Sequence, residues 1–297
     1  MSNPHLEVPE FLAVGHVTHD LVNGEIRPGG AALYSALTAH RLGKRTAVLT
    51  SHAEDYVGGR VLEGISRQLV RSPRTSTFRN LYETGRRSQF VYSSAEPLGT
   101  HHLPEAWRGA GVVYLCPVLH EIPPAAGWGR ADALVGLAPQ GWLRQWDQQG
   151  RIEGRRWKGF EAFLGTARFL IASEQDLAGM ESLIGEFRRL VPVVVVTKAE
   201  QGAVIYTPGK TFVFGVYPAT ERDPTGAGDC FGAAFLIRYR ETGGDLREAG
   251  RFASCVASFV VEKEGTEGIP FRDEVSRRMQ SHTIPCQESP EQDGSPG

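Results

Sequence analysis

The stretch DPTGAGDCFGAAFL, residues 223–236, places three small residues between two aspartates and then becomes apolar. It follows a strand-like run, TFVFGV (211–216), and its apolar part has the composition of a buried helix. The small residues therefore fall at a predicted helix N-terminus, where backbone N–H groups lack helical partners and the dipole is positive. Two interpretations are open: an ordinary helix start with a capping acid, or a phosphate-binding turn beside a catalytic acid.

The second interpretation requires amides that a phosphate can approach closely. Gly226, Ala227 and Gly228 carry little or no side chain, and the N–H groups of Ala227, Gly228 and Asp229 are expected to be unpaired. Asp229 falls in the first helical turn, where the dipole favours the ionised carboxylate. Such an acid can take a hydroxyl proton while the amides hold the charge of a migrating phosphoryl group. Taken alone, however, the short string favours the capped helix start.

Outward from this stretch, short apolar runs alternate with helix-like runs. Several of the apolar runs lack a polar face, as expected for strands buried on both sides of a parallel sheet. The order predicts a doubly wound α/β fold. The predicted strands are 10–15, 45–51, 111–116, 131–138, 167–173, 191–197, 202–207 and 211–216. The predicted helices are 31–43, 57–69, 173–190 and 227–243, with a helix or helix pair over 245–265.

Two segments depart from this alternation. Residues 76–98 alternate in side-chain character around Glu83-Thr84-Gly85, which predicts a β-hairpin. Such a hairpin either covers a cleft as a flap or decorates the edge of the sheet, and both interpretations stay open from this segment alone. Residues 281–297 are polar and rich in Pro, Gly and Ser, so we expect a disordered tail.

Composition limits the class of protein. The 297 residues are 41% hydrophobic and 22% charged, with a net charge of -2, so a large core can form. Nothing in this balance is typical of nucleic-acid binding. The first residues lack a signal-peptide pattern, no apolar run is long enough for a membrane helix, and the four cysteines form no CxxC pair. We therefore expect a cytoplasmic globular protein with neither a nucleic-acid nor a membrane partner.

Further motifs occur in a fixed order along the chain. A strand-like run leads to Asp20, and Gly29-Gly30 precedes the predicted helix 31–43. A short polar turn joins the two strands in VVVVTKAEQGAVIYT (193–207). With AEDYVGGRVLEGI (53–65), SEQD (173–176) and the opening stretch, this order resembles the ribokinase/PfkB family of carbohydrate kinases over residues 10–270. A dinucleotide oxidoreductase is disfavoured because no early GxGxxG motif is present.

The resemblance implies a ribokinase-like α/β fold, with a central, mostly parallel sheet flanked by helices and a small β lid. The kinase domain would span 1–280, and the lid would come from about 16–30 and 76–98. The implied activity is ATP-dependent phosphorylation of a hydroxyl on a small polyol, with Mg²⁺ as cofactor. The implied partners are that polyol and ATP, and the protein would be a monomer or homodimer.

Roles for individual residues follow from the same resemblance. Asp229 matches the catalytic base, and Gly226, Ala227 and Gly228 match the anion hole. Asp176 matches the Mg²⁺-organising acid. The residues matching substrate-binding positions are Asp20, Gly29, Gly30 and Tyr34. Those on the nucleotide side are Thr197, Lys198, Gly202, Thr225, Ala253, Val256 and Ala257.

Three positions depart from the family pattern. Tyr34 stands where Asn is common, Ser173 replaces the Asn of the Asn-x-x-Glu motif, and Ala199 stands where Gly is usual. The first two are more similar to the inositol-kinase branch, so a myo-inositol-like cyclitol is favoured, with its C–H face against Tyr34. The alternatives are a ribose, fructose or nucleoside kinase, or a non-catalytic binding protein on this fold. Asp229 with its small-residue turn argues against the non-catalytic alternative.

Overall fold

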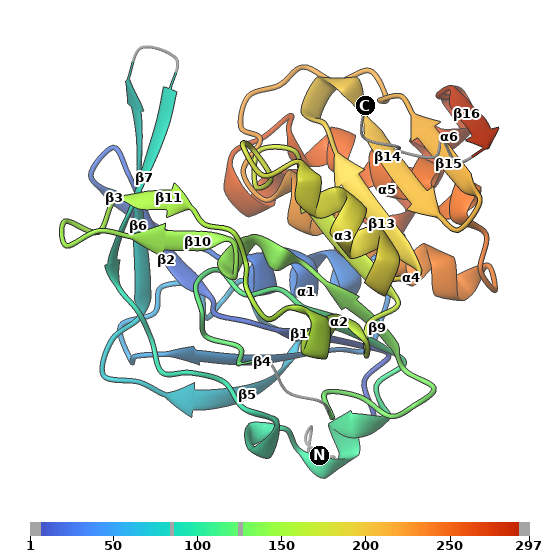
Figure 1. Cartoon of the computed structure of the whole chain (residues 1–297). Helices are drawn as coiled ribbons and strands as arrows, with labels where there is room; N and C mark the ends of the chain where they lie inside the picture. Colours follow the sequence, from blue (N-terminus) through green and yellow to red (C-terminus); the bar gives the residue numbers. More distant parts are fainter. Residues whose placement is uncertain (1–6, 84–85, 124–126, 291–297) are drawn as a thin grey trace.

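The computed structural model describes residues 7–83, 86–123 and 127–290. A ten-stranded sheet runs through the described part of the molecule, in the order β16-β15-β14-β13-β12-β9-β8-β1-β4-β5 (Figure 1). The pairings from β5 to β13 are parallel, and those that add β14, β15 and β16 are antiparallel. The predicted central, mostly parallel sheet is confirmed. Its strands are β1 (Phe11–Val14), β4 (Thr46–His52), β5 (Ser66–Arg71), β8 (Val112–Leu115), β9 (Leu134–Leu137), β12 (Phe169–Ser173), β13 (Val193–Thr197), β14 (Ala203–Thr207), β15 (Lys210–Phe214) and β16 (Cys286–Pro290).

Helices cover both faces of this sheet, and two cores result. Alternate side chains of β1 point to opposite faces, so Phe11 and Ala13 join one core while Leu12 and Val14 join the other. Helices α1 (Ala31–Arg41), α4 (Ala227–Glu241), α5 (Leu246–Val260) and α6 (Arg272–Ser281) contribute to the first core. Helices α2 (Glu161–Leu164) and α3 (Ser182–Leu190) contribute to the second. No helix in the described part of the chain is long and apolar enough to cross a membrane.

A separate four-stranded sheet stands at one side of the central sheet (Figure 1). It consists of β3 (Glu25–Gly29), β2 (Thr18–Val22), β6 (Ser76–Glu83) and β7 (Arg86–Ser93), in that order. Strands β6 and β7 form the predicted hairpin, whose turn at 84–85 lies outside the described residues. The parallel pairing of β2 with β6 joins two segments that are distant in sequence. The sheet therefore has the composition expected of the lid.

A second, smaller hairpin packs beside the lid and was not predicted. It pairs β10 (Arg144–Trp146) with β11 (Ile152–Gly154). The N–H of Val91 on β7 donates to the carbonyl of Gly150 in the hairpin turn, at 2.8 Å. This contact extends the lid by a segment that comes from the middle of the chain.

Two helix predictions were wrong. Most of the predicted helix 57–69 forms turns, and its last residues begin strand β5, which pairs with β4. Three glycines within 57–69 make a helix costly there. Of the predicted helix 173–190, only α3 from Ser182 onward is regular, because Gly179 adopts a φ of 74° that interrupts a right-handed helix.

The prediction of a disordered tail over 281–297 was wrong for strand β16. Strand β16 pairs antiparallel with β15, and Glu288 forms ion pairs with Lys210 and Arg247. A polar strand can be held at a sheet edge by main-chain hydrogen bonds and ion pairs without a hydrophobic face, which the composition alone did not indicate. Residues 291–297 lie outside the described part.

Candidate active site

A cavity of about 690 Å³ lies where the lid meets the central sheet. Its wall includes Asp20 and Phe78 from the lid, residues that follow β12 and β13, and the N-terminal ends of α1 and α4. The carboxyl ends of parallel strands and the first turns of helices are the usual places for ligand sites in α/β folds. This is where most of the predicted site residues meet.

The turn before α4 is fixed from both sides. Gly226 is the residue before the helix and has a φ of 78°, a left-handed conformation that favours glycine. The carboxylate of Asp223 accepts hydrogen bonds from the N–H of Thr225 and of Gly265, both at 3.0 Å. The turn is thereby tied to the loop that follows α5. Its amides are held in place before any ligand binds.

The amides of the turn do not all match the expectation. The N–H of Ala227 donates to the carbonyl of Pro224 at 3.2 Å, so the prediction that it is unpaired was wrong. This hydrogen bond within the turn makes the N–H of Ala227 unavailable to a ligand. The N–H groups of Gly228 and Asp229 have no acceptor among the described residues. Both residues line the cavity, so two amide donors at the positive end of α4 are available to an anion.

Asp229 is half-buried in the cavity wall. Burial raises the pKa of its carboxyl to about 7, helped by the negative charges of Asp176 and Asp20 and opposed by the positive charge of Arg144. The sequence suggested that the helix dipole would favour the ionised form, but burial outweighs it. A carboxyl with a pKa near neutrality can both accept and release a proton, as a general base requires.

The glycine pair makes room for the residues that pack closely against it. A Cβ at Gly29 would lie 2.3 Å from Oδ2 of Asp20, and one at Gly30 would lie 2.5 Å from the carbonyl oxygen of His16. Asp20 accepts a hydrogen bond from the hydroxyl of Thr18 at 2.9 Å. Asp20 and Gly30 line the cavity, whereas Gly29 does not and acts by making room for the Asp20 carboxylate.

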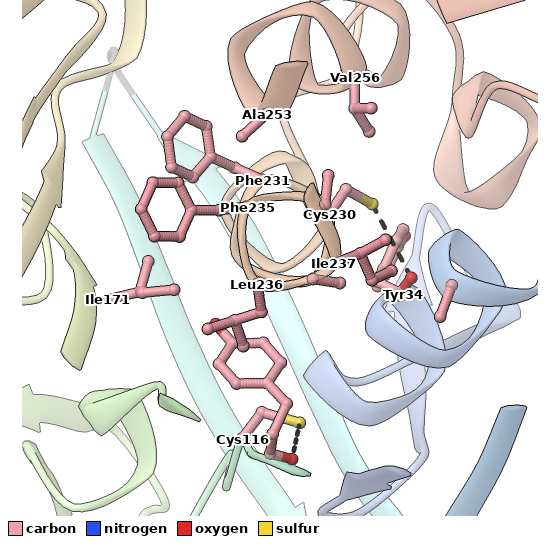
Figure 2. Close-up of a cluster of buried hydrophobic side chains, with 14 of the residues drawn as sticks. Tyr34, Cys116, Ile171, Cys230, Phe231, Phe235, Leu236, Ile237, Ala253 and Val256 are labelled. Atoms are coloured by element: carbon pink, nitrogen blue, oxygen red, sulfur yellow. Dashed lines mark hydrogen bonds between the residues drawn. The ribbon is translucent and has the colours of Figure 1, made fainter. Parts of the chain in front are cut away.

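Tyr34 lies between the two halves of the site. It is 3% exposed, lines the cavity, and its ring lies against Gly226. Burial raises the pKa of its phenol well above the ordinary value, so the hydroxyl stays protonated and can donate a hydrogen bond. In Figure 2 it lies on α1 beside α4, where the Cys230 thiol donates to its carbonyl oxygen at 3.9 Å. It supports the anion-binding turn and also presents part of an aromatic ring to the cavity.

Asp176 is held by three hydrogen bonds. Its Oδ2 accepts from the N–H and the hydroxyl of Ser173, at 3.2 and 2.7 Å, and its Oδ1 accepts from Nε2 of Gln140 at 3.1 Å. A carboxylate offers about four acceptor positions, so one position is left for a water or a hard cation such as Mg²⁺. Within the described residues, no cluster of three or more His, Cys, Asp or Glu side chains could hold a metal ion by itself. A metal ion held by Asp176 would therefore need phosphate or water as further ligands.

The residues predicted on the nucleotide side fall in two groups in the structure. Thr197, Gly202, Thr225 and Ala257 line the cavity, but Lys198, Ala253 and Val256 do not. Ala253 and Val256 are fully buried and face α4, beside Phe231 and Cys230 (Figure 2). The face of α5 that lines the cavity is set by helical periodicity and consists of Ser254, Ala257, Ser258 and Val261.

The structure also brings in residues that the sequence analysis missed. Phe78 and Gln89 come from the two strands of the lid hairpin, and its two-residue alternation could have indicated them. Gln140 lies in a short 3-10 helix after β9 and Arg144 is the first residue of β10, and no sequence pattern pointed to either. Arg144 is the cation that acts on the pKa of Asp229, so the omission concerns the centre of the site.

Comparison with known proteins agrees with this architecture. Residues 160–272 match the model of the pfkB family carbohydrate kinases. A nucleoside kinase of Methanothermobacter thermautotrophicus is 29% identical over 91% of this chain and 95% of its own length. A pyrophosphate-dependent kinase of the ribokinase family, solved with a pyrophosphate analog and myo-inositol, superposes with a TM-score of 0.73 at 22% identity, covering 90% of this chain and 99% of that one. Arabidopsis thaliana ribokinase, solved with ribose and ATP, gives a TM-score of 0.72 at 21% identity, covering 92% and 99%. The last two similarities concern the fold.

Proposed function

Because the chain belongs to the ribokinase/PfkB family of carbohydrate kinases, we propose that it transfers the γ-phosphoryl group of ATP to a hydroxyl of a small polyol bound beneath the lid. As a member of this family it is a sugar or nucleoside kinase, a phosphotransferase with an alcohol acceptor. The acceptor, the residue roles and the use of Mg²⁺ are the proposed parts. A cytoplasmic location and a monomeric or homodimeric state stay predictions.

One observation carries the proposal: a carboxyl whose pKa is about 7 lies directly beside two available amides at a helix N-terminus. The acid can remove a proton from a hydroxyl, and the amides can hold the charge of a phosphoryl group. Both line a cavity that a β lid borders. A protein that only bound a polyol would gain nothing from this pairing.

In the proposed step, Asp229 accepts the proton of the acceptor hydroxyl as that oxygen attacks the γ-phosphorus. The bond between the γ-phosphorus and the β–γ bridging oxygen breaks, and ADP leaves with its electron pair. The N–H groups of Gly228 and Asp229 hold charge on the phosphoryl oxygens. Asp176, positioned by Ser173 and Gln140, would hold Mg²⁺, which neutralises phosphate charge when bound. The lid would exclude water, which competes as an acceptor.

The donor side of the cavity supports a nucleotide. Its wall contains the apolar residues Val216, Tyr217, Pro218, Ala219, Ala257 and Val261, which suit a planar base. Arg144 is the one lysine or arginine among the described residues of the cavity wall, whereas inorganic pyrophosphate carries high charge without a base and depends on cationic partners. We therefore propose ATP as donor, in contrast to the pyrophosphate-dependent structural relative.

Two acceptor classes have support on the acceptor side. Tyr34 lines the cavity near Asp20, as a cyclitol with an apolar C–H face and adjacent hydroxyls would require. This favours myo-inositol or a similar cyclitol. The second candidate is a nucleoside, because the aromatic ring of Phe78 also lines the cavity and could stack on a base. The relative that matches over 91% of this chain is a nucleoside kinase.

A coupled assay of ADP release with myo-inositol, ribose, fructose and adenosine tests the proposal. We expect ATP-dependent turnover, with the highest kcat/KM for myo-inositol. The matched variant Asp229→Asn keeps the shape of the side chain and should lower kcat by roughly 10²–10⁴ while ATP still binds. A clear preference for adenosine or ribose would contradict the cyclitol acceptor but not the kinase activity. Turnover by Asp229→Asn at the wild-type rate would contradict the catalytic role.

A further inference from the structure

Arg144 is the one cationic side chain among the described residues that line the cavity. It lies on β10, in the small hairpin that packs beside the lid. Its Nη1 donates to the carbonyl of Val118 at 2.9 Å, and its guanidinium carbon lies 5.9 Å from the centroid of the Phe78 ring. Nε2 of His120 lies 2.7 Å from the Arg144 carbonyl oxygen and fixes the main chain. Both ends of the residue are therefore held.

The rest of the cavity wall carries negative charge. The negative charge of this wall would repel a phosphoryl group unless positively charged groups also line the cavity. Backbone amides supply partial charges only, so a full cation inside the wall is of particular value. The carboxylates of the described cavity wall belong to Asp20, Glu174, Asp176, Glu200, Glu221 and Asp229.

Arg144 lies within electrostatic reach of the proposed base. Its positive charge lowers the pKa of Asp229, against the effect of burial and of the carboxylates Asp176 and Asp20. The charged groups that act on Asp229 therefore come from the turn after β12, from lid strand β2 and from β10. Three further side chains near Asp229 are neutral, because burial raises the pKa values of Tyr34, Tyr114 and Cys230.

The segment that carries Arg144 also contacts Asp176. Gln140 lies four residues earlier and donates to Oδ1 of Asp176 at 3.1 Å. The segment 138–144 thus places an amide on Asp176 and a guanidinium near Asp229. Gln140 therefore contacts one of the two acids, and the charge of Arg144 acts on the other.

We propose that Arg144 is a catalytic residue, whose guanidinium contacts the phosphoryl group as that group passes to the acceptor oxygen. This inference rests on the proposed function and adds a residue to it. As the O–P bond to the acceptor forms and the bond to the β–γ bridging oxygen breaks, charge is spread over the phosphoryl oxygens. The planar guanidinium presents paired N–H donors that match two of those oxygens, whereas a lysine ammonium is a point charge.

Variants at position 144 test the inference, with the acceptor that the wild-type protein phosphorylates fastest among myo-inositol, ribose, fructose and adenosine. Arg144→Gln should lower kcat by roughly 10²–10³, as does loss of a transition-state hydrogen-bond donor elsewhere, with little change in either KM. Arg144→Lys should lower kcat less than Arg144→Gln does, because lysine keeps the positive charge. Guanidinium ion, below the concentration that unfolds the protein, should restore part of the activity of Arg144→Ala. Arg151→Gln, in the exposed turn of the same hairpin, is the matched control and should leave kcat unchanged.

Several results would overturn the inference. An unchanged kcat with a raised acceptor KM would make Arg144 a ground-state binding residue. Loss of activity without guanidinium rescue, together with a lowered Tm in both Arg144→Gln and Arg144→Lys, would make its role structural. If the wild-type protein is active and Arg144→Gln equally active, only this inference fails. If the wild-type protein phosphorylates none of the acceptors, the proposed function fails as well.

Discussion

The ring of Tyr34 lies against the backbone of Gly226, so that a Cβ at position 226 would be 2.2 Å from Cδ1 of the tyrosine. This contact joins α1, which begins at the glycine pair near Asp20, to the turn that presents the amides of α4. The position of the amides therefore depends on an aromatic side chain from the acceptor side. A substitution of either residue should therefore change the position of the other.

The first prediction concerns this contact. Gly226→Ala introduces a steric clash with Tyr34 and a positive φ that costs about 1–2 kcal/mol by itself, so we expect a lowered Tm and a lowered kcat. The double variant Gly226→Ala/Tyr34→Leu should recover part of the Tm, because the clash is relieved while the backbone strain remains. Thermal unfolding of the three proteins measures this.

Gly228→Ala is the matched control, because a Cβ there would meet nothing within 4 Å. It should leave the Tm unchanged. A Tm for Gly226→Ala equal to that of the wild type would show that the turn adapts to a side chain.

The second prediction is a pH profile. A base with a pKa of about 7 must be ionised to act, so kcat/KM should rise with pH and level off above about 7. The Asp229→Asn variant should lose this acidic limb along with most of its activity. Initial rates across the pH range, at saturating ATP, provide the test. An acidic limb centred near the ordinary value of 3.8 would contradict the effect of burial.

The raised pKa of Asp229 leads to a third prediction, which concerns the stability of the folded protein. Because the pKa of Asp229 is raised from 3.8 to about 7 in the folded state, the folded protein binds more protons than the unfolded chain between these values. The contribution of Asp229 to stability therefore falls as pH rises through that window. Asp229→Asn removes this fall, so its Tm should exceed that of the wild type at about pH 8 and approach it at about pH 4. Equal Tm differences at the two pH values would count against the prediction.

The fourth prediction concerns Gln140 and Mg²⁺. Gln140→Leu removes a hydrogen bond to Asp176, so the carboxylate should be less well oriented and a higher Mg²⁺ concentration should be needed for half-maximal activity. Second-sphere losses of this kind typically weaken metal binding by roughly 10- to 100-fold. Mg²⁺ titration of activity, together with calorimetric titration of Mg²⁺ and ADP, gives two independent readouts.

Gln145→Leu is the control for Gln140→Leu, because Gln145 is exposed on β10. EDTA should abolish wild-type turnover. Undiminished turnover in EDTA would contradict the use of a metal, and an unchanged Mg²⁺ requirement in Gln140→Leu would contradict the positioning role.

The fifth prediction concerns the lid. Arg27 on β3 forms an ion pair with Glu264 at 2.7 Å, which links the lid to the loop after α5. If the lid covers bound substrate, amides of β6 and β7 should exchange more slowly with deuterium when the acceptor is added. The buried strand β13 serves as internal reference, because its exchange should already be slow. Unchanged exchange in the lid at saturating acceptor would leave the hairpin as an edge decoration.

Much of this architecture was determined by the sequence alone. The buried runs 191–197 and 202–207 lack a polar face, and the small residues of 226–228 before an apolar run indicate a helix start. These are local signals, since strand burial, helix starts and turns depend on residues close together in the chain. They sufficed for most of the order of strands and helices and for the lid hairpin.

The tertiary structure decided what depends on which segments meet. Arg144 reaches the cavity because an unpredicted hairpin packs against the lid, and no neighbour in sequence indicates that contact. Ala253 and Val256 face α4 because the phase of α5 is set by its packing. The pKa of Asp229 is a sum over Asp176, Asp20, Arg144 and burial, all contributed by segments distant in sequence. Charge interactions and desolvation depend on distances between side chains in the folded protein, and these distances cannot be read from the order of residues along the chain.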